Sequence, residues 1–317
     1  MNNILCIGEA LIDMICTDKG KPLSEGEHFL KKAGGAPTNV AAAICALGGK
    51  ALLAAKVGVD PFGTHLVEVM QSFGVDTRYV YRSAQHFTTF AFVSLMQNGE
   101  RDFYFNRGAD GELTPDDIDS IDLSACSIAH FGSATAFLPG PLQHSYRLLL
   151  DACLAKGIFI SFDPNYRHLL FSGNTESFVS QSWQYLRHCH FFKVSDEEAM
   201  LLTGKPSVEE AAAELQRQTT AVFAITLGKD GTLLGINGSM RIIPSIPVNP
   251  VDTTGAGDAF VGALLYQLSN LGVPAMQALS AERWAALVAN ANKAGARTCQ
   301  YLGAMEAFRH LNNDIFK

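Results

Sequence analysis

The sequence predicts an α/β protein organised around a mostly parallel β-sheet. Short apolar runs alternate along the chain with longer stretches of helical periodicity, which is typical of βαβ units. One segment, residues 87–110, departs from this alternation and has the pattern of a hairpin. The 317 residues, 48% hydrophobic and 17% charged, suffice for a large core. We therefore expect one domain over residues 1–317, with a small β appendage.

Six apolar runs are predicted to be strands of the main sheet. Each is short and is bounded by turn residues or by a helical pattern. The runs begin at Asn3, Ala51, Ser127, Gly157, His190 and Ala221. Because helical stretches separate most consecutive runs, we expect these strands to pair in parallel.

Two of the predicted helices have clear apolar faces. In NVAAAICALGG, which starts at Asn39, the residues Val40, Ile44 and Leu47 fall on one face, and two glycines end the helix. The stretch FVGALLYQLSNLG, residues 260–272, has a similar stripe. Both helices are expected to pack on the main sheet.

The hairpin pattern of residues 87–110 centres on Asn98 and Gly99. Asn-Gly between two alternating apolar runs is a strong signal for a tight turn. Together with residues 13–32, this segment is predicted to form a small β-sheet outside the main one. Such a sheet can be an ordinary edge hairpin, a lid that closes over a ligand, or a surface that pairs with a second copy of the chain.

Composition and charge favour a small-molecule ligand. The net charge of −7 argues against nucleic acid as a partner, because binding to a phosphate backbone needs clustered Lys and Arg. No apolar run reaches the roughly 18 residues that suggest a membrane span. The first residues, MNNILCIGEALIDMI, lack a cationic leader with a cleavage site. We expect a cytoplasmic protein.

The stretch VDTTGAGDAF, residues 251–260, has the composition of an anion-binding turn. Its glycines remove side-chain bulk, so the N–H groups of Ala256, Gly257 and Asp258 can approach an anion at the positive end of the following helix. The Asp258 carboxylate would then lie beside that anion and could accept a proton from a hydroxyl that attacks phosphorus. The alternative is a tight turn followed by a favourable first-turn acid.

Two common nucleotide motifs are absent. The chain has no Gly-x-x-x-x-Gly-Lys-[Ser/Thr], and GAGDAF lacks the third glycine of Gly-x-Gly-x-x-Gly. An NAD-dependent oxidoreductase would need a dinucleotide turn after the first strand, and CIGEALID does not supply one. Phosphoryl transfer to an alcohol is therefore the favoured chemistry.

Two long motifs resemble the signatures of the ribokinase-like (PfkB-type) carbohydrate kinases. VDTTGAGDAF resembles the family's C-terminal signature, and AGGAPTNVAAAICALGG, residues 33–49, its N-terminal one. The resemblance extends over essentially the whole chain. It implies a three-layer α/β/α sandwich with a mostly parallel sheet, a small β-sheet lid over the sugar, MgATP as donor and a primary hydroxyl of a sugar as acceptor.

The resemblance also implies roles for individual residues. Asp258 would be the catalytic base, with an anion hole formed by Gly255, Ala256 and Gly257. The implied sugar contacts are Asp13, Gly34, Gly35 and Asn39. The alternatives from the residues alone are a helix cap for Asn39 and an exposed loop acid for Asp13.

Nucleotide and magnesium contacts are implied at three further segments. Thr226 and Gly228 lie where the family has its nucleotide-phosphate turn, and Asn292 where it lines the adenine pocket. Glu198 matches the acid that organises the waters of Mg²⁺, whereas Ser195 replaces the family's asparagine. The bland alternatives are a helix-surface amide for Asn292 and a solvated helix acid for Glu198.

A monovalent cation, most simply K⁺, is implied near the anion hole. The matching positions are Asp252, Thr254, Thr298, Gly303 and Ala307, mostly through backbone carbonyls. Several candidate residues also follow predicted strands: Asp13, Asp163, Ser195, Thr226 and Asp252. In an open parallel sheet such residues gather along the carboxyl edge, where ligands bind.

The acceptor is expected to be D-fructose, phosphorylated on O6. SFDPNYR and GERDFYFNRGAD resemble bacterial fructokinases, and within them Arg167 and Arg107 would contact a phosphate or the sugar, unless they are ordinary surface arginines. The same motifs also resemble 2-keto-3-deoxygluconate kinases and aminoimidazole riboside kinases. A catalytically silent regulatory protein is the non-enzyme alternative. A homodimer is expected by resemblance.

Overall fold

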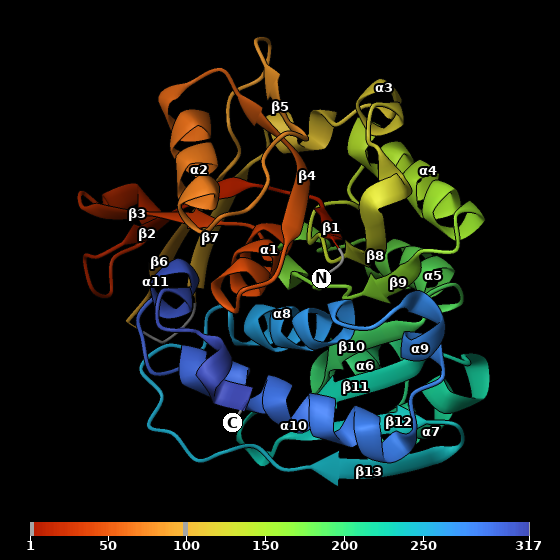
Figure 1. The fold of residues 1–317 in the computed structure, drawn as a ribbon. Coiled ribbons are helices and arrows are strands. Elements are labelled where there is room, and N and C mark those ends of the chain that lie inside the picture. The colour runs from red at the N-terminus through yellow and green to blue at the C-terminus, as the bar shows by residue number, and fades with distance from the viewer. Residues whose placement is uncertain (1–2, 98–100, 317) are drawn as a thin grey trace.

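The computed structural model describes residues 3–97 and 101–316, which form two β-sheets and a set of covering helices (Figure 1). The large sheet has the strand order β13-β12-β11-β10-β9-β8-β1-β4-β5 within the described residues. Its strands are β1 (Asn3–Ile7), β4 (Ala51–Gly58), β5 (Val80–Ser83), β8 (Cys126–Phe131), β9 (Phe159–Phe162), β10 (Phe191–Ser195), β11 (Val222–Thr226), β12 (Thr232–Ile236) and β13 (Ser239–Ile243).

The six predicted strands are confirmed, and they pair in parallel in the order β11-β10-β9-β8-β1-β4. Strand β5 extends this parallel set, whereas β12 and β13 add an antiparallel edge. The last three strands were not among the predicted runs. The prediction that Asp252 follows a strand is wrong: residues 244–250 have no regular structure, because Pro244, Pro247 and Pro250 cannot donate to a sheet ladder.

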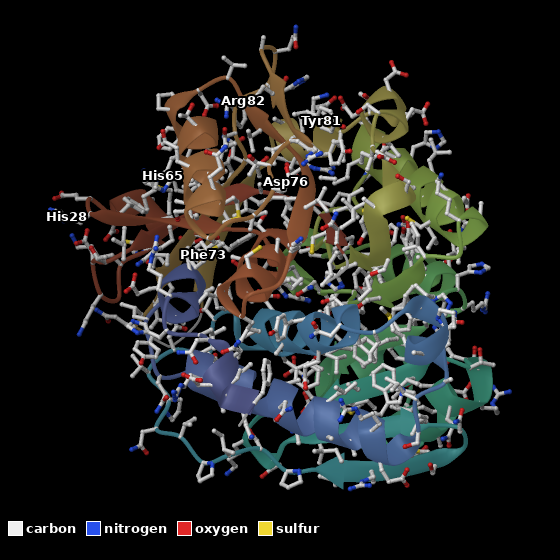
Figure 2. The ribbon with its side chains drawn as sticks, viewed as in Figure 1. His28, His65, Phe73, Asp76, Tyr81 and Arg82 are labelled. Atoms are coloured by element: carbon white, nitrogen blue, oxygen red, sulfur yellow. The ribbon has the colours of Figure 1, made fainter. Side chains whose placement is uncertain are left out.

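The small sheet consists of β2 (Leu11–Cys16), β3 (Phe29–Gly34), β6 (Phe90–Leu95) and β7 (Arg101–Asn106), in the order β3-β2-β6-β7. Strands β6 and β7 are antiparallel, which confirms the hairpin, while the predicted turn at Asn98 and Gly99 lies outside the described residues. The sheet is separate from the large one and projects from it (Figure 1). Figure 2 places His28 at its outer end, where Nδ1 lies 3.0 Å from Asp18 Oδ1.

Helices cover both faces of the large sheet. The helices are α1 (Ala36–Ala46), α2 (Pro61–Ser72), α3 (Pro115–Asp119), α4 (Pro141–Ala155), α5 (Thr175–Leu186), α6 (Asp196–Thr203), α7 (Val208–Gln218), α8 (Ala256–Ser269), α9 (Val273–Gln277), α10 (Ala281–Thr298) and α11 (Ala304–Phe308). Among the described residues, none of these helices has both the length and the apolar composition needed to cross a membrane.

The core is divided by the sheet into two apolar layers. In β1, Ile4 and Cys6 face the layer that contains α1, α8 and α10, whereas Leu5 and Ile7 face the layer of α4 to α7. The chain is thus the expected three-layer α/β/α sandwich with a small second sheet.

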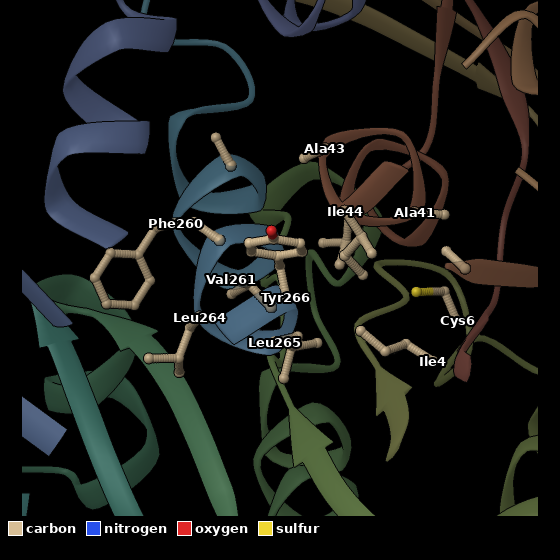
Figure 3. Packing of buried hydrophobic residues seen from close by; sticks show 14 of the residues in the cluster. Ile4, Cys6, Ala41, Ala43, Ile44, Phe260, Val261, Leu264, Leu265 and Tyr266 are labelled. Atoms are coloured by element: carbon tan, nitrogen blue, oxygen red, sulfur yellow. The ribbon is translucent and has the colours of Figure 1, made fainter. Parts of the chain in front are cut away.

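Close packing of α1 against α8 positions the ends of both helices. Figure 3 shows Ala43 and Ile44 of α1 beside Leu265 and Tyr266 of α8. At Gly262 the two helices approach closely, because a Cβ atom there would lie 2.8 Å from the Cβ of Ala43. The N-termini of α1 and α8 are therefore held near each other, and both carry predicted site residues.

Candidate active site

The candidate site lies at the carboxyl ends of the parallel strands. Asp163 follows β9, Ser195 ends β10 and Thr226 ends β11, so these three predictions about the sheet edge are confirmed. A cleft of about 400 Å³ opens there. It is lined by Asn165, Tyr166, Arg167, Lys193, Ser195, Glu197, Glu198 and Leu201. Strand order reverses between β1 and β8, which makes this edge a typical ligand site of open α/β sheets.

The glycine-rich turn forms the N-terminus of α8, as predicted. Gly255 is the N-cap, with a left-handed φ of 80°, and α8 begins at Ala256. The N–H of Ala256 is not free for an anion, because it donates to Thr253 O at 3.2 Å. The amides of Gly257 and Asp258 have no acceptor among the described residues. Of the predicted anion hole, only these two amides are available, and their binding of an anion stays a prediction, whereas Gly255 and Ala256 shape the turn.

Substitution of Gly255 by Ala should destabilise the protein and slow turnover. A Cβ atom there would lie 2.5 Å from Ala304 Cβ, and the positive φ adds strain of about 1 kcal/mol. Gly48→Ala is the matched control, because Gly48 has φ 91° but open space around it. Thermal unfolding and kcat measure both effects. An equal loss of stability in the two variants would contradict the packing argument.

Asp258 is buried and meets Asn39 across the contact of the two helices. Asn39 Nδ2 donates to Asp258 Oδ2 at 2.8 Å. Burial raises the pKa of Asp258 to about 6, as does the charge of Asp163, while the Asn39 hydrogen bond and the charges of Arg167 and Lys193 act in the opposite direction. Such a carboxyl is ionised at neutral pH and basic enough to take a proton.

Asn39 is not a helix cap, because Gly35 occupies the N-cap of α1. Its Oδ1 is buried and has no hydrogen-bond partner among the described residues. The side chain therefore orients the Asp258 carboxylate with its amide nitrogen and leaves an acceptor for a ligand hydroxyl. This arrangement links the N-terminal and C-terminal motifs of the chain in one site.

Asp13 lies in a strand and is half-buried, so the exposed-loop alternative is wrong. It is paired with Lys32 of β3 and Ala91 of β6 in the small sheet. Gly34 leaves room for it, because a Cβ on Gly34 would lie 2.1 Å from Asp13 Oδ2. Burial raises the pKa of Asp13 to about 6 against the opposing charge of Arg167. The charge of Arg167 thus lowers the pKa of both Asp13 and Asp258.

Glu9 holds the Gly34-Gly35 turn and was not anticipated. Gly35 has φ 109°, and a Cβ there would lie 2.3 Å from the Glu9 carbonyl oxygen. The buried Glu9 carboxyl accepts from Ala36 N at 2.9 Å and from Ser133 Oγ at 2.5 Å. Burial raises its pKa to about 7. An acid between apolar residues, in CIGEALID, was the available signal.

The two predicted arginine contacts, Arg107 and Arg167, differ in their hydrogen-bond partners and in their position relative to the cleft. Arg107 donates to Pro139 O at 2.6 Å and to Thr135 O at 3.2 Å, so it braces the loop before α4, and its predicted ligand contact is not supported. Arg167 lines the cleft and donates to Asn165 Oδ1 at 3.3 Å. It remains a candidate contact for sugar or phosphate.

Ser195 and Glu198 form a capping box that starts α6. Ser195 Oγ accepts from Glu198 N at 3.1 Å, and Glu198 Oε2 accepts from Ser195 N at 2.8 Å. Glu198 Oε1 also accepts from Tyr166 N at 2.7 Å. Glu198 is buried, so it is not a solvated helix acid. Both residues face the cleft, where a role at the waters of Mg²⁺ stays a prediction.

Lys193 also lines the candidate site, although the sequence motifs did not point to it. Its Nζ lies 3.1 Å from Asp163 Oδ2, and its side chain is buried although it lines the cleft. The signal in the sequence was a single lysine inside the apolar run HFFKVS.

The predicted nucleotide residues divide into two groups. Thr226 ends β11 and donates to Val194 O at 3.3 Å, and Gly228 is exposed with open space around it, so both are accessible positions at the sheet edge. Asn292 is instead internal: its Oδ1 accepts from Thr232 Oγ1, and its Nδ2 donates to the carbonyls of residues 243 and 244. Asn292 anchors α10 to the antiparallel edge, so neither the adenine contact nor a helix-surface position is supported.

The segments predicted to bind a monovalent cation do come together. Asp252 accepts from Thr254 N at 3.0 Å and Gly303 N at 2.8 Å, and thereby ties the turn before α8 to the start of α11. The carbonyls of Thr298, Gly303 and Ala307 each accept a backbone hydrogen bond, from Tyr301, Ala307 and His310 respectively. Their binding of a cation stays a prediction.

Known proteins were compared with the chain. The model of the pfkB family carbohydrate kinases matches residues 1–310. The chain belongs to the pfkB family of carbohydrate kinases. This kinase is 37% identical to fructokinase-1 of Zea mays over 268 residues, which cover 84% of the chain and 82% of the maize protein.

Two solved structures resemble the whole kinase. A fructokinase double mutant from Vibrio cholerae O395, in a form with bound fructose, ADP and potassium ion, shares 30% identity at a TM-score of 0.85, covering 100% and 97% of the two chains. Aminoimidazole riboside kinase from Salmonella enterica, complexed with aminoimidazole riboside and an ATP analogue, shares 27% identity at a TM-score of 0.82, covering 99% and 98%. The ribokinase-like fold expected from the two motifs is confirmed.

Proposed function

We propose that this pfkB-family kinase transfers the γ-phosphate of ATP to O6 of D-fructose and produces fructose 6-phosphate. The observation that carries the proposal is Asp258, an ionisable buried carboxyl beside two free amides at the N-terminus of α8. The maize and Vibrio cholerae fructokinases support fructose as acceptor. Because ATP is the donor, we propose that the protein acts in the cytoplasm.

The acceptor hydroxyl is activated and oriented by the chain's own residues. Asp13 and the free Oδ1 of Asn39 accept hydrogen bonds from sugar hydroxyls. Asp258 receives the proton of the attacking hydroxyl as that oxygen bonds to the γ-phosphorus. The amides of Gly257 and Asp258 donate to the phosphoryl oxygens, at the positive end of α8.

Turnover should fall at acidic pH. Asp258 acts as a base only when ionised, and its raised pKa of about 6 places the loss of activity below that pH. Asp13 has a similarly raised pKa, so protonation of either acid lowers kcat/KM for the sugar, by roughly tenfold per pH unit for each group. A pH profile of kcat/KM between pH 5 and 8 measures the effect. A flat profile down to pH 5 would exclude this base.

The nucleotide is proposed to lie along the ends of β10 and β11. Thr226 and Gly228 would contact its phosphates, and Ser195 and Glu198 would hold the waters of Mg²⁺, which neutralises phosphate charge. This proposal is supported by the position of Ser195 and Glu198 in the lining of the cleft. For K⁺ we propose the turn that Asp252 fixes to Gly303, since a bound cation would offset the charge of nearby acids.

The small sheet is proposed to be a lid and a dimer surface. Asp13 lies on it, so its position controls the sugar site. It exposes three large apolar side chains on one face, Ile15, Leu30 and Leu95, and Tyr104 on the other. Exposed apolar residues gathered on one element favour an interface, here with a second copy of the chain. A monomeric mass by light scattering across working concentrations would exclude the homodimer.

The acceptor is tested with a panel of substrates. ATP-dependent ADP formation is measured with D-fructose, D-ribose, 2-keto-3-deoxygluconate and aminoimidazole riboside, and the product is identified by mass spectrometry. Preference for fructose in kcat/KM is expected. Aminoimidazole riboside is the second candidate, because the Salmonella kinase covers the chain almost as completely. No turnover with any acceptor, in a protein that still binds ATP, would favour a regulatory role.

A further inference from the structure

We propose that Lys193 is a catalytic residue, whose ammonium group binds the phosphoryl group during its transfer from ATP to the acceptor. This inference rests on the proposed function, because it concerns the same transfer. It assigns a third donor to the phosphoryl site, beside the amides of Gly257 and Asp258.

The side chain of Lys193 points towards the helix that carries the anion hole. Strand β10 lies between β9 and β11, so its side chains alternate between the two faces of the sheet. Phe192 and Val194 pack in the layer of α4 to α7, whereas Phe191 packs in the layer of α8 and α10. Lys193 shares the face of Phe191, two positions nearer to the carboxyl edge. Its long side chain therefore reaches the N-terminus of α8.

The ammonium lies against the turn. A Cβ atom on Gly257 would be 3.2 Å from Lys193 Nζ and 3.6 Å from its Cε. Gly257 also supplies one of the two free amides at the start of α8. An anion that accepts from this amide is thus within reach of Nζ. The absence of a side chain at position 257 is what leaves the space between lysine and turn open to such a group.

The ammonium is charged and only partly engaged. Burial by itself would lower the pKa of Lys193, but the nearby carboxylates of Asp163, Glu198 and Asp258 raise it above its ordinary value. An ammonium has three N–H donors. Nζ lies 3.1 Å from Asp163 Oδ2, an oxygen that has no hydrogen-bond partner among the described residues, and no other partner of Nζ is found there. The remaining donors are therefore available to a phosphoryl oxygen.

The chemical step balances without a further reactant. The acceptor oxygen forms a bond to the γ-phosphorus, and the bond from phosphorus to the β–γ bridging oxygen breaks, with its electron pair leaving on ADP. The proton of the acceptor hydroxyl goes to Asp258. Lys193 keeps its protons throughout and offsets negative charge on the transferred group.

The alternative is a lysine that only pairs with Asp163 inside the fold. The two roles differ in what a neutral side chain of similar length does. If the ion pair is purely structural, removal of the lysine leaves an uncompensated buried carboxylate and lowers the stability of the fold. If the ammonium is catalytic, its removal lowers kcat, and an external amine can restore the activity.

The first experiment compares Lys193→Met with Lys56→Met. Lys56 is the matched control: its Nζ lies 2.7 Å from Asp117 Oδ2, its side chain is only 14% exposed, and it does not line the cleft. We expect Lys193→Met to lower kcat by about 10²-fold, as loss of one preorganised donor does, with the KM for sugar changed little. Lys56→Met should keep kcat. Equal kcat in the two variants would overturn the proposal.

The second experiment is chemical rescue in Lys193→Ala. Methylammonium and ethylammonium are added to the variant, and turnover is followed against amine concentration, with tetramethylammonium as a control for ionic strength. Saturable rescue by the primary amines alone is expected. A folded variant, shown by thermal unfolding, that no amine restores would overturn the role of the ammonium.

Nucleotide binding separates this inference from the proposed acceptor. Calorimetry with ADP and with a non-hydrolysable ATP analogue needs no sugar. Lys193→Met should weaken the binding of the ATP analogue more than the binding of ADP, because Nζ is placed at the transferred phosphoryl group. If wild-type protein fails to phosphorylate fructose but shows this difference, the acceptor is wrong and the role of Lys193 stands. Equal weakening of both nucleotides would count against Lys193.

Discussion

Asp258→Asn should lower kcat for phosphorylation by about 10²- to 10⁴-fold, while fructose affinity changes little. The amide has nearly the shape of the carboxyl and can still accept from Asn39 Nδ2, so the contact of α1 with α8 is retained. It cannot take the proton of the acceptor hydroxyl. Steady-state kinetics and equilibrium binding of fructose separate the two effects.

Stability gives an independent readout of the same variant. The pKa of Asp258 is raised in the folded protein, so the native state binds more protons than the unfolded state between about pH 4 and 6, and the ionised carboxyl costs stability above that range. Asp258→Asn should therefore unfold at a temperature equal to or above that of the wild type at neutral pH. Glu282→Gln is the control, because Glu282 is an exposed first-turn acid of α10. Equal kcat in both variants would leave Asp258 as a mere first-turn acid.

Asp13→Asn should lower kcat/KM for fructose by about 10²-fold or more, chiefly through KM. A hydrogen bond to a charged group is worth about 1.5–3 kcal/mol, and each oxygen of the Asp13 carboxylate can accept one from a sugar hydroxyl. The site already constrains the side chain, since Gly34 leaves space for one carboxyl and no Cβ. Initial rates across fructose concentrations at saturating ATP measure the change.

Asp18→Asn is the matched control for Asp13. Asp18 lies between β2 and β3 but accepts from Glu27 N and His28 N at the outer end of the small sheet. It should leave the KM for fructose unaltered. A similar rise of KM in both variants would mean that the small sheet, and no specific contact of Asp13, governs sugar binding.

The fold was predictable because its signals are local. The six parallel strands are apolar runs bounded by turns, and the hairpin follows from alternation around one turn. The start of α8 at Ala256 follows from the glycines before it. Each of these features depends on a few neighbouring residues, so it can be predicted without knowing how distant segments pack.

The missed parts of the site depend on contacts between distant segments. No residue near Asn292 in the sequence shows that its side-chain amide is hydrogen-bonded to Thr232 and to the carbonyl of Ile243 in β13. Likewise, the functional interest of Lys193 depends on its position beside Gly257, a residue far from it in the sequence. The bond that occupies the amide of Ala256 depends on the exact path of the turn.

The pairing of β2 with β6 sets an order on folding. Ile12 pairs with Phe90, and β4, α2 and β5 lie between them in the chain. Closing so long a loop is costly until β4 has docked on β1 and β5 on β4, which shortens it. Refolding should therefore complete the large sheet first and the small sheet last. Newly made chains would then form the edge proposed to bind nucleotide before they position Asp13, the proposed sugar contact, so the ability to phosphorylate would be the last property gained as the protein matures.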